Sequence, residues 1–209
     1  MLRRRGSDES VERRLNRSGS NVFSVLRSWR DVREDETQRY AFVRDGLRQM
    51  FPDFFDDFEF YPAGQFVAGG LRLLPFDKTI RATLAPDGWF VTLLHLTALA
   101  STDTGDVIAI DEPENALHPR AIKTLLPLMR EWSKRRGVTV LLATHSPVII
   151  DAFRECPEKL YVMEPGRDLL PVALSELHEP DWLAHFALGD LYTHEEFGAR
   201  SCIRAVAVR

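Results

Sequence analysis

The stretch Val107-Ile-Ala-Ile-Asp-Glu-Pro-Glu114 decides how this 209-residue sequence is interpreted. Its first four residues are a continuous apolar run, which predicts a parallel strand buried on both faces of a sheet. The run ends in Asp111 and Glu112, and open α/β sheets bind their ligands at the carboxyl ends of the strands. An isolated run of this kind is equally typical of a strand that ends at a solvated loop, so the prediction depends on the next part of the chain.

A second apolar strand is predicted at residues 138–143, and it ends in Thr144-His145-Ser146-Pro147. Between the two strands, residues 119–136 have apolar side chains at intervals of three and four, with a proline in the first turn and a glycine after the last. A third strand is predicted at residues 159–163. This order of strands and helices is typical of right-handed crossovers in a parallel sheet, which places His145 at the same edge as the two acids.

These residue types can divide the work of phosphate chemistry. Asp111 is expected to hold Mg²⁺, usually through water, because a hard cation prefers carboxylate oxygen beside nucleotide phosphates. Glu112 is expected to act as the base that polarises an attacking water. A neutral His145 could donate a hydrogen bond to a γ-phosphate oxygen or to that water. A lone histidine is more often structural, but its pairing with the acidic strand favours the functional interpretation.

The N-terminal half has a different pattern. Residues 1–20 are rich in Arg, Ser, Asp and Glu and have little to bury, so a flexible arm is predicted. Helices are predicted at residues 22–29 and 40–50, and short strands that include Phe58, Phe60 and residues 66–74 indicate a small antiparallel sheet. A helix is expected to follow Pro86-Asp87-Gly88 and to end at Ala100.

Composition excludes several classes of protein. The net charge of -4 and the isoelectric point near 5.9 argue against a protein that coats nucleic acid by bulk charge. Cys156 and Cys202 have no metal-binding spacing and are expected to be reduced thiols. The most apolar stretch, residues 89–100, is shorter than the roughly 20 residues that span a bilayer. We therefore expect a cytoplasmic protein without a membrane segment, and the N-terminus lacks the apolar run of a secretory signal.

The segments VIAIDEPENALHP, residues 107–119, and VLLATHSP, residues 140–147, together resemble a block found in ATPases related to RecF, SMC and ABC proteins. The resemblance is strongest to the bacterial AAA-type group that includes the ATPase part of OLD nucleases. It covers roughly residues 18–200, including Leu188-Gly-Asp-Leu-Tyr192, which is similar to an LGELW segment of these ATPases. It implies an α/β fold, in which a P-loop NTPase-like partial parallel sheet is flanked by helices, with a small antiparallel and helical subdomain on the N-terminal side.

The resemblance also implies roles for particular segments. Residues 107–112 correspond to the Walker B strand, residues 114–119 to the D-loop, and His145 to the switch histidine. The D-loop would place Asn115 and His118 against a partner subunit across bound nucleotide, whereas helix capping and turn formation are the structural alternative for both residues.

A signature loop is expected just before the Walker B strand, where the sequence reads Leu84-Ala-Pro-Asp-Gly-Trp89. By this resemblance Ala85, Asp87 and Gly88 are expected to bind nucleotide, because Gly88 and the helix start suit a loop that presents backbone N–H groups to a phosphate in the opposing subunit. Ala85 replaces the usual serine and removes a hydroxyl donor. The bulky side chain of Trp89 is expected to lie beside the phosphate. This signature segment, residues 84–89, is therefore degenerate.

The chain contains no GxxxxGK[ST] sequence, so no phosphate-binding Walker A loop can be assigned. Residues 21–209 are accordingly interpreted as the C-terminal part of an ABC-type ATPase domain. It would bind ATP and Mg²⁺ and hydrolyse ATP together with a partner chain that supplies Walker A. The resemblance also implies a homo- or heterodimer through the D-loop face, with DNA reached through the assembly, in DNA repair or phage defence. The alternative is a truncated, non-catalytic regulatory module that keeps the dimer interface. A nuclease finds little support, because no further acidic cluster with metal spacing occurs after residue 165.

Overall fold

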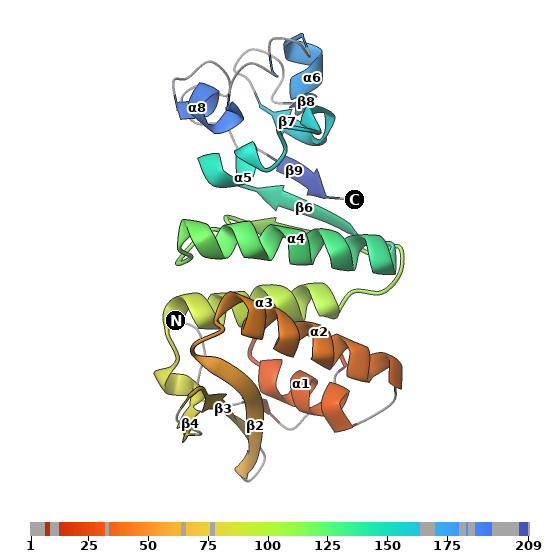
Figure 1. Cartoon of the computed structure of the whole chain (residues 1–209). Helices are drawn as coiled ribbons and strands as arrows, with labels where there is room; N and C mark the ends of the chain where they lie inside the picture. Colours follow the sequence, from red (N-terminus) through yellow and green to blue (C-terminus); the bar gives the residue numbers. More distant parts are fainter. Residues whose placement is uncertain are drawn as a thin grey trace. The chain divides into compact units, whose positions relative to one another are not determined.

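The computed structural model describes residues 7–8, 13–31, 34–63, 66–75, 78–163, 170–179, 183, 187–193 and 205–208 (Figure 1). The chain divides into two compact units, Met1–Thr102 and Asp103–Arg209. Each unit combines strands with helices, so the α/β class predicted from the sequence is confirmed.

The first unit contains the predicted antiparallel sheet. Strands β2 (Phe55–Ala63) and β3 (Phe66–Leu73) pair along most of their length. Two shorter strands, β1 (Ser7–Asp8) and β4 (Lys78–Arg81), pair with different parts of β3. The strand order is β1-β3-β2, with β4 joined to β3.

Three helices accompany this sheet. They are α1 (Val22–Asp31), α2 (Glu34–Met50) and α3 (Asp87–Ala100), and α3 follows the short 3₁₀ helix η1 (Ala82–Leu84). Helix α2 begins earlier than the sequence predicted. The prediction missed this start because the first turn is acidic and has no apolar periodicity. Acidic residues are nevertheless favoured at that end of a helix by the helix dipole.

Aromatic side chains form the centre of the first unit. Trp89 of α3 is fully buried, with its ring 5.4 Å from that of Phe55 and 6.1 Å from that of Phe58. Trp29 of α1 is also fully buried, and its indole N–H donates a 3.0 Å hydrogen bond to the carbonyl oxygen of Arg13. The Trp89 contacts join α3 to the sheet, and the Trp29 hydrogen bond joins α1 to the segment that precedes it.

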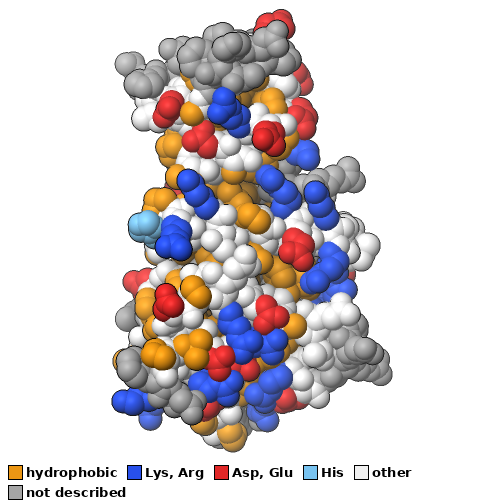
Figure 2. All heavy atoms as spheres, viewed as in Figure 1, with side chains coloured by type: hydrophobic (Ala, Val, Ile, Leu, Met, Phe, Trp, Pro, Cys, Tyr) orange, Lys and Arg blue, Asp and Glu red, His pale blue; other side chains and the backbone are white. Residues whose placement is uncertain are grey.

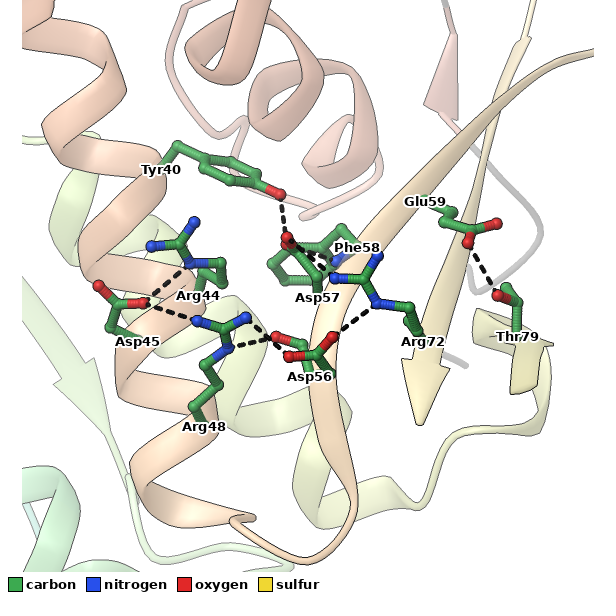
Figure 3. A network of polar contacts seen from close by, with 10 residues as sticks. All are labelled: Tyr40, Arg44, Asp45, Arg48, Asp56, Asp57, Phe58, Glu59, Arg72 and Thr79. Atoms are coloured by element: carbon green, nitrogen blue, oxygen red, sulfur yellow. Dashed lines mark hydrogen bonds and ion pairs between the residues drawn. The ribbon is translucent and has the colours of Figure 1, made fainter. Parts of the chain in front are cut away.

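Helix α2 is tied to the sheet by the polar network in Figure 3. The Asp56 carboxylate accepts from Arg72 at 2.6 Å and from Arg48 at 2.7 Å, so it links β3 and α2 through β2. These two guanidinium groups, that of Arg72 first, hold the pKa of Asp56 below its ordinary value. The neighbouring Asp57 accepts a 2.7 Å hydrogen bond from the hydroxyl of Tyr40. Each guanidinium group of the network is paired with a carboxylate, so the network serves the structure of the unit.

Part of the predicted flexible arm has defined partners. The backbone N–H of Leu15 donates to Ser101 at 3.0 Å, and the Asn21 side chain donates to the carbonyl oxygen of Arg14 at 3.0 Å. Residues 1–6 and 9–12 of the arm lie outside the described residues. The segment that begins at Arg13 therefore lies along the first unit.

The second unit begins with the predicted strand, helix and strand. Strand β5 (Val107–Asp111) pairs in parallel with β6 (Thr139–Ala143), and helix α4 (Pro119–Arg136) connects them. Gly137 ends the helix with φ 65°, the left-handed conformation that favours glycine. The short helix α5 (Pro147–Asp151) follows β6. The small parallel sheet and its connecting helix are confirmed.

The rest of the sheet departs from the prediction. After the 3₁₀ helix η2 (Pro157–Lys159) come β7 (Leu160–Val162), β8 (Val172–Ala173) and the helices α6 (Leu174–Leu177) and α8 (Leu188–Thr193). The last strand, β9 (Ala205–Val208), lies between β6 and β7 and is antiparallel to both. Because β9 is antiparallel to both β6 and β7, the three predicted strands β5, β6 and β7 run in the same direction, as expected. The insertion of β9 between β6 and β7 was not predicted, because an apolar run does not reveal which strand lies beside it.

The prediction that β5 is buried on both faces was also wrong. The sheet order is β5-β6-β9-β7-β8, so β5 is an edge strand. Ile110 is buried, whereas Val107 is 63% exposed and Ala109 and Asp111 on the same face are exposed. One face of β5 is therefore covered and the other, which carries Asp111, is open.

Candidate functional site

The ends of β5 and β6 bring the predicted catalytic residues to one edge. Asp111 is paired with Ala143 in the parallel register. The next residue, Glu112, extends this pairing, since its backbone N–H donates to the carbonyl oxygen of Ala143 at 2.8 Å. Thr144 and His145 come directly after Ala143. The sequence prediction that two acids and a histidine share one sheet edge agrees with this arrangement.

The backbone turns sharply at Glu112. Its φ is 46°, a left-handed conformation that is uncommon for a residue with a side chain and that often marks functional sites. The same is true of Ala116, with φ 62°. Between them, the Asn115 side chain donates a 2.6 Å hydrogen bond to Oε2 of Glu112. This bond orients the half-buried carboxylate that was predicted to act as the base.

Glu114 connects the turn after β5 to the segment that follows β6. Its Oε1 accepts from the hydroxyl of Thr144 at 2.7 Å and from the backbone N–H of His145 at 3.0 Å. The Thr144 hydroxyl in turn accepts from the backbone N–H of Ser146 at 3.0 Å. The other oxygen, Oε2, is buried without a hydrogen-bond partner among the described residues. Sequence reasoning assigned Glu114 to the D-loop but not to the site, although a third acid right after two site acids was a usable signal.

Two further predicted residues make local contacts. His118 is the N-cap of α4, and its Nδ1 accepts from the backbone N–H of Arg120 at 3.2 Å. Asn115 bonds to Glu112 across the turn. Both side chains are exposed, so capping and turn formation account for their contacts within the chain. A role for either residue against a partner subunit remains a prediction.

The imidazole of His145 is exposed, and its Nδ1 lies 3.3 Å from the hydroxyl oxygen of Tyr192 in α8. Tyr192 belongs to the segment that is similar to LGELW, but the sequence predicted no role for it. A contact between residues so far apart in the chain leaves no local pattern from which it could have been inferred.

The signature-like residues belong to the first unit. The backbone N–H of Ala85 donates to the carbonyl oxygen of Ala82 at 3.1 Å, so it is already used within the loop. Gly88 and the exposed Asp87 lie in the first turn of α3. The N-terminal end of a helix attracts anions, and the negative charge of Asp87 opposes that attraction. The expectation that Trp89 stands beside a phosphate was wrong, because its side chain is buried in the aromatic core.

The described residues offer few grouped side chains that could bind a metal ion. The described residues contain no group of three or more His, Cys, Asp or Glu side chains that could hold a metal ion. The Asp111 side chain is exposed and accepts no hydrogen bond from the described residues. Mg²⁺ is usually bound by one or two carboxylates together with substrate phosphates and water. Asp111 therefore fits a magnesium ion that arrives with a nucleotide better than an independent metal centre.

The described helices include none long and apolar enough to cross a membrane.

Two transporter ATP-binding proteins are similar in sequence to part of this chain. EcfA1, an energy-coupling factor transporter ATP-binding protein of Methanospirillum hungatei, is 31% identical over 83 residues, which is 39% of this chain and 29% of the relative. MetN, a methionine import ATP-binding protein of Lactobacillus johnsonii, is 34% identical over 70 residues, 34% of this chain and 19% of the relative. The chain thus spans less than a third of the length of these relatives.

Residues 6–151 match the family described as "AAA domain, putative AbiEii toxin, Type IV TA system". The match includes the signature-like segment, β5, the D-loop and His145, and it covers well over half of the chain. Membership of an ATPase family implies nucleotide binding. The chain belongs to this family of AAA domains, which is of the ABC type.

Proposed function

We propose that this chain binds and hydrolyses ATP as the C-terminal part of an ABC-type ATPase of the RecF, SMC and OLD group. The observation that carries the proposal is the meeting of Asp111, Glu112 and His145 at the ends of two paired parallel strands. Strained backbone at Glu112 and the hydrogen bond from Asn115 support it, because such strain is retained mostly where function requires a particular geometry.

Each residue has a role that its chemistry permits. Asp111 would hold Mg²⁺ together with the nucleotide phosphates, and the ion would supply positive charge opposite the charge that develops on them. Glu112 would accept the proton of the water that attacks the γ-phosphorus. His145 would donate to a γ-phosphate oxygen and thereby stabilise the charge that it gains.

A partner chain would supply the Walker A loop that the sequence lacks. The open face of β5 supports this view, because apolar side chains such as Val107 and Ala109 are normally covered in a parallel sheet. Asp111 lies on this face, so an element that covered it could also bring phosphate-binding groups to the carboxylate. Without such groups we expect the chain alone to bind ATP weakly. The exposed D-loop residues Asn115 and His118 would contact the partner.

DNA is the second partner that we propose, and α4 supports it. The helix has six basic residues and one acid, Glu131, although the whole chain has a net charge of -4. Blue side chains lie over the region of α4 in Figure 2. The helix dipole explains basic residues in the last turn, but it disfavours Arg120 and Lys123 near the first turn. Exposed cations at both ends suit a phosphate backbone, in DNA repair or phage defence.

A non-catalytic regulatory module is the second candidate function. The observations in its favour are the backbone N–H of Ala85, which is already bonded within its own loop, and the negative charge of Asp87 at the start of α3. Both weaken the expected binding of a phosphate by the signature segment. Such a module would keep the D-loop contacts with a partner but would not turn over ATP.

The experiment that separates the two functions is steady-state ATP hydrolysis with Mg²⁺ by the purified chain, alone and mixed with the product of the neighbouring upstream gene. We expect activity in the mixture only. Glu112→Gln should lower it about a hundred- to ten-thousandfold. Glu155→Gln, which changes an exposed acid outside the site, should leave it unchanged. No activity in any mixture, with partner binding retained, would favour the regulatory module.

A further inference from the structure

Helix α8 carries a side chain to the switch histidine. The hydroxyl oxygen of Tyr192 lies 3.3 Å from Nδ1 of His145, within hydrogen-bond distance. The two residues are 47 positions apart in the sequence. Tyr192 is half-buried, so its ring has packing contacts as well as this polar one. The contact therefore depends on how α8 is held against the segment that comes after β6.

Gly189 allows α8 to lie close to α5. A Cβ atom at this position would be only 2.7 Å from the carbonyl oxygen of Pro147 and 2.9 Å from Oδ2 of Asp151. The backbone N–H of Gly189 donates to Oδ1 of Asp151 at 2.7 Å, which ties the start of α8 to the end of α5. Leu188 and Leu191 of the same helix are buried. A residue larger than glycine would push α8 away, and Tyr192 with it.

The direction of the hydrogen bond between Tyr192 and His145 is coupled to the nitrogen of a neutral imidazole that carries the proton. A phenol is a good hydrogen-bond donor, and the unprotonated nitrogen of a neutral imidazole is a good acceptor. If the Tyr192 hydroxyl donates to Nδ1, the proton of His145 must be on Nε2. The backbone N–H of His145 is bonded to Glu114, so the backbone and the ring of this residue are held by different parts of the unit.

We propose that Tyr192 is a positioning residue that keeps neutral His145 in its Nε2–H tautomer, with Gly189 and Asp151 holding α8 in place. The tautomer itself is independent of ATP. Its consequence rests on the proposed function, because an Nε2–H group is the donor that His145 would offer to a phosphate oxygen. The segment Leu188–Tyr192 thereby acquires a role in the switch.

The first test is a long-range ¹H–¹⁵N NMR spectrum of the full chain with ¹⁵N-labelled histidine, at a pH where imidazole is neutral and without nucleotide. The signals of His145 are assigned by their loss in His145→Gln. We expect mainly the Nε2–H pattern in the unsubstituted chain. Tyr192→Phe keeps the ring but removes the hydroxyl, and it should lower the ratio of Nε2–H to Nδ1–H about fivefold, which corresponds to about 1 kcal/mol.

Matched variants make the result specific. Tyr161→Phe removes the hydroxyl of an exposed tyrosine in β7 and should leave the tautomer ratio of His145 unchanged. Gly189→Ala should change the ratio in the same direction as Tyr192→Phe while the spectrum remains that of a folded chain. An Nδ1–H pattern in the unsubstituted chain, or an unchanged ratio in Tyr192→Phe, would overturn the proposal.

A second measurement relates the tautomer to turnover. In an active mixture with the Walker A partner, Tyr192→Phe should lower kcat about fivefold, with KM nearly unchanged. Combining it with His145→Gln should cause no further loss, because both changes remove the same donor. Additive losses would show that Tyr192 acts by another route. A normal tautomer in an inactive mixture would count against the proposed ATPase function and leave the role of Tyr192 intact.

Discussion

Oε1 of Glu114 accepts a 3.0 Å hydrogen bond from the backbone N–H of His145, and the same oxygen accepts from the hydroxyl of Thr144 at 2.7 Å. One carboxylate of the turn after β5 therefore holds the segment that presents His145.

Glu114→Ala removes both hydrogen bonds and should lower the free energy of unfolding by about 1–3 kcal/mol, because the hydroxyl of the buried Thr144 loses its acceptor. Glu114→Gln keeps an acceptor oxygen and should cost less. Urea unfolding measures both variants, and amide hydrogen exchange at His145 reports the local effect. Equal stability of the two variants, with unchanged exchange at His145, would show that Glu114 does not hold the switch segment.

His95 should make stability depend on pH. Burial lowers its pKa from 6.5 to about 4, and Nδ1 has no hydrogen-bond partner among the described residues. The unfolded chain binds the proton more readily, so the contribution of neutral His95 to stability is complete above pH 6.5. It is lost as the pH falls from 6.5 to about 4, by about 3 kcal/mol in total.

The test compares unfolding of the unsubstituted chain and of His95→Leu at several pH values. Leucine has no proton to bind, so the slope of stability between pH 6.5 and 4 should become shallower. His178→Gln, in the second unit, is the matched control and should keep the original slope. A slope that His95→Leu leaves unchanged would assign the acid sensitivity to other groups.

The free energy of unfolding should depend on which residue replaces Gly137. Its φ of 65° is left-handed, and a Cβ atom there would be 3.5 Å from the nearest heavy atom, in ordinary van der Waals contact. The cost of a substitution therefore comes from the backbone. Gly137→Val should lower the free energy of unfolding by about 1–2 kcal/mol, whereas Gly137→Asn should cost less because asparagine tolerates this region. Chemical denaturation of the two variants measures the difference, and equal costs would contradict the explanation.

The basic residues of α4 should contribute to DNA binding by the assembled ATPase. Lys123→Glu combined with Lys134→Glu should weaken the affinity for duplex DNA and reduce the slope of log affinity against log salt by about 2. Fluorescence anisotropy with a labelled duplex at several salt concentrations measures both. Lys78→Glu, an exposed lysine of β4, serves as the control and should have a smaller effect. An unchanged salt slope in the double variant would remove α4 from the DNA interface.

Much of the local structure could be predicted from the sequence. The helix that became α4 was located by its apolar spacing, by Pro119 and by Gly137, because these signals act within a few residues. Local signals also predicted the strands β5 and β6 and the antiparallel pair β2 and β3, in these cases through apolar runs bounded by turn residues. The early start of α2 was missed, since its acidic first turn has no apolar periodicity.

The sequence by itself determined the two strands that lead to Asp111, Glu112 and His145, because strand and turn preferences are local. Tertiary structure alone decided that β5 is an edge strand with an open face and that β9 lies between β6 and β7. It also decided that Glu114 contacts the backbone of His145 and Tyr192 its ring. The physical reason is that sheet order and long-range hydrogen bonds depend on the packing of distant segments, which leaves no periodic pattern in either segment.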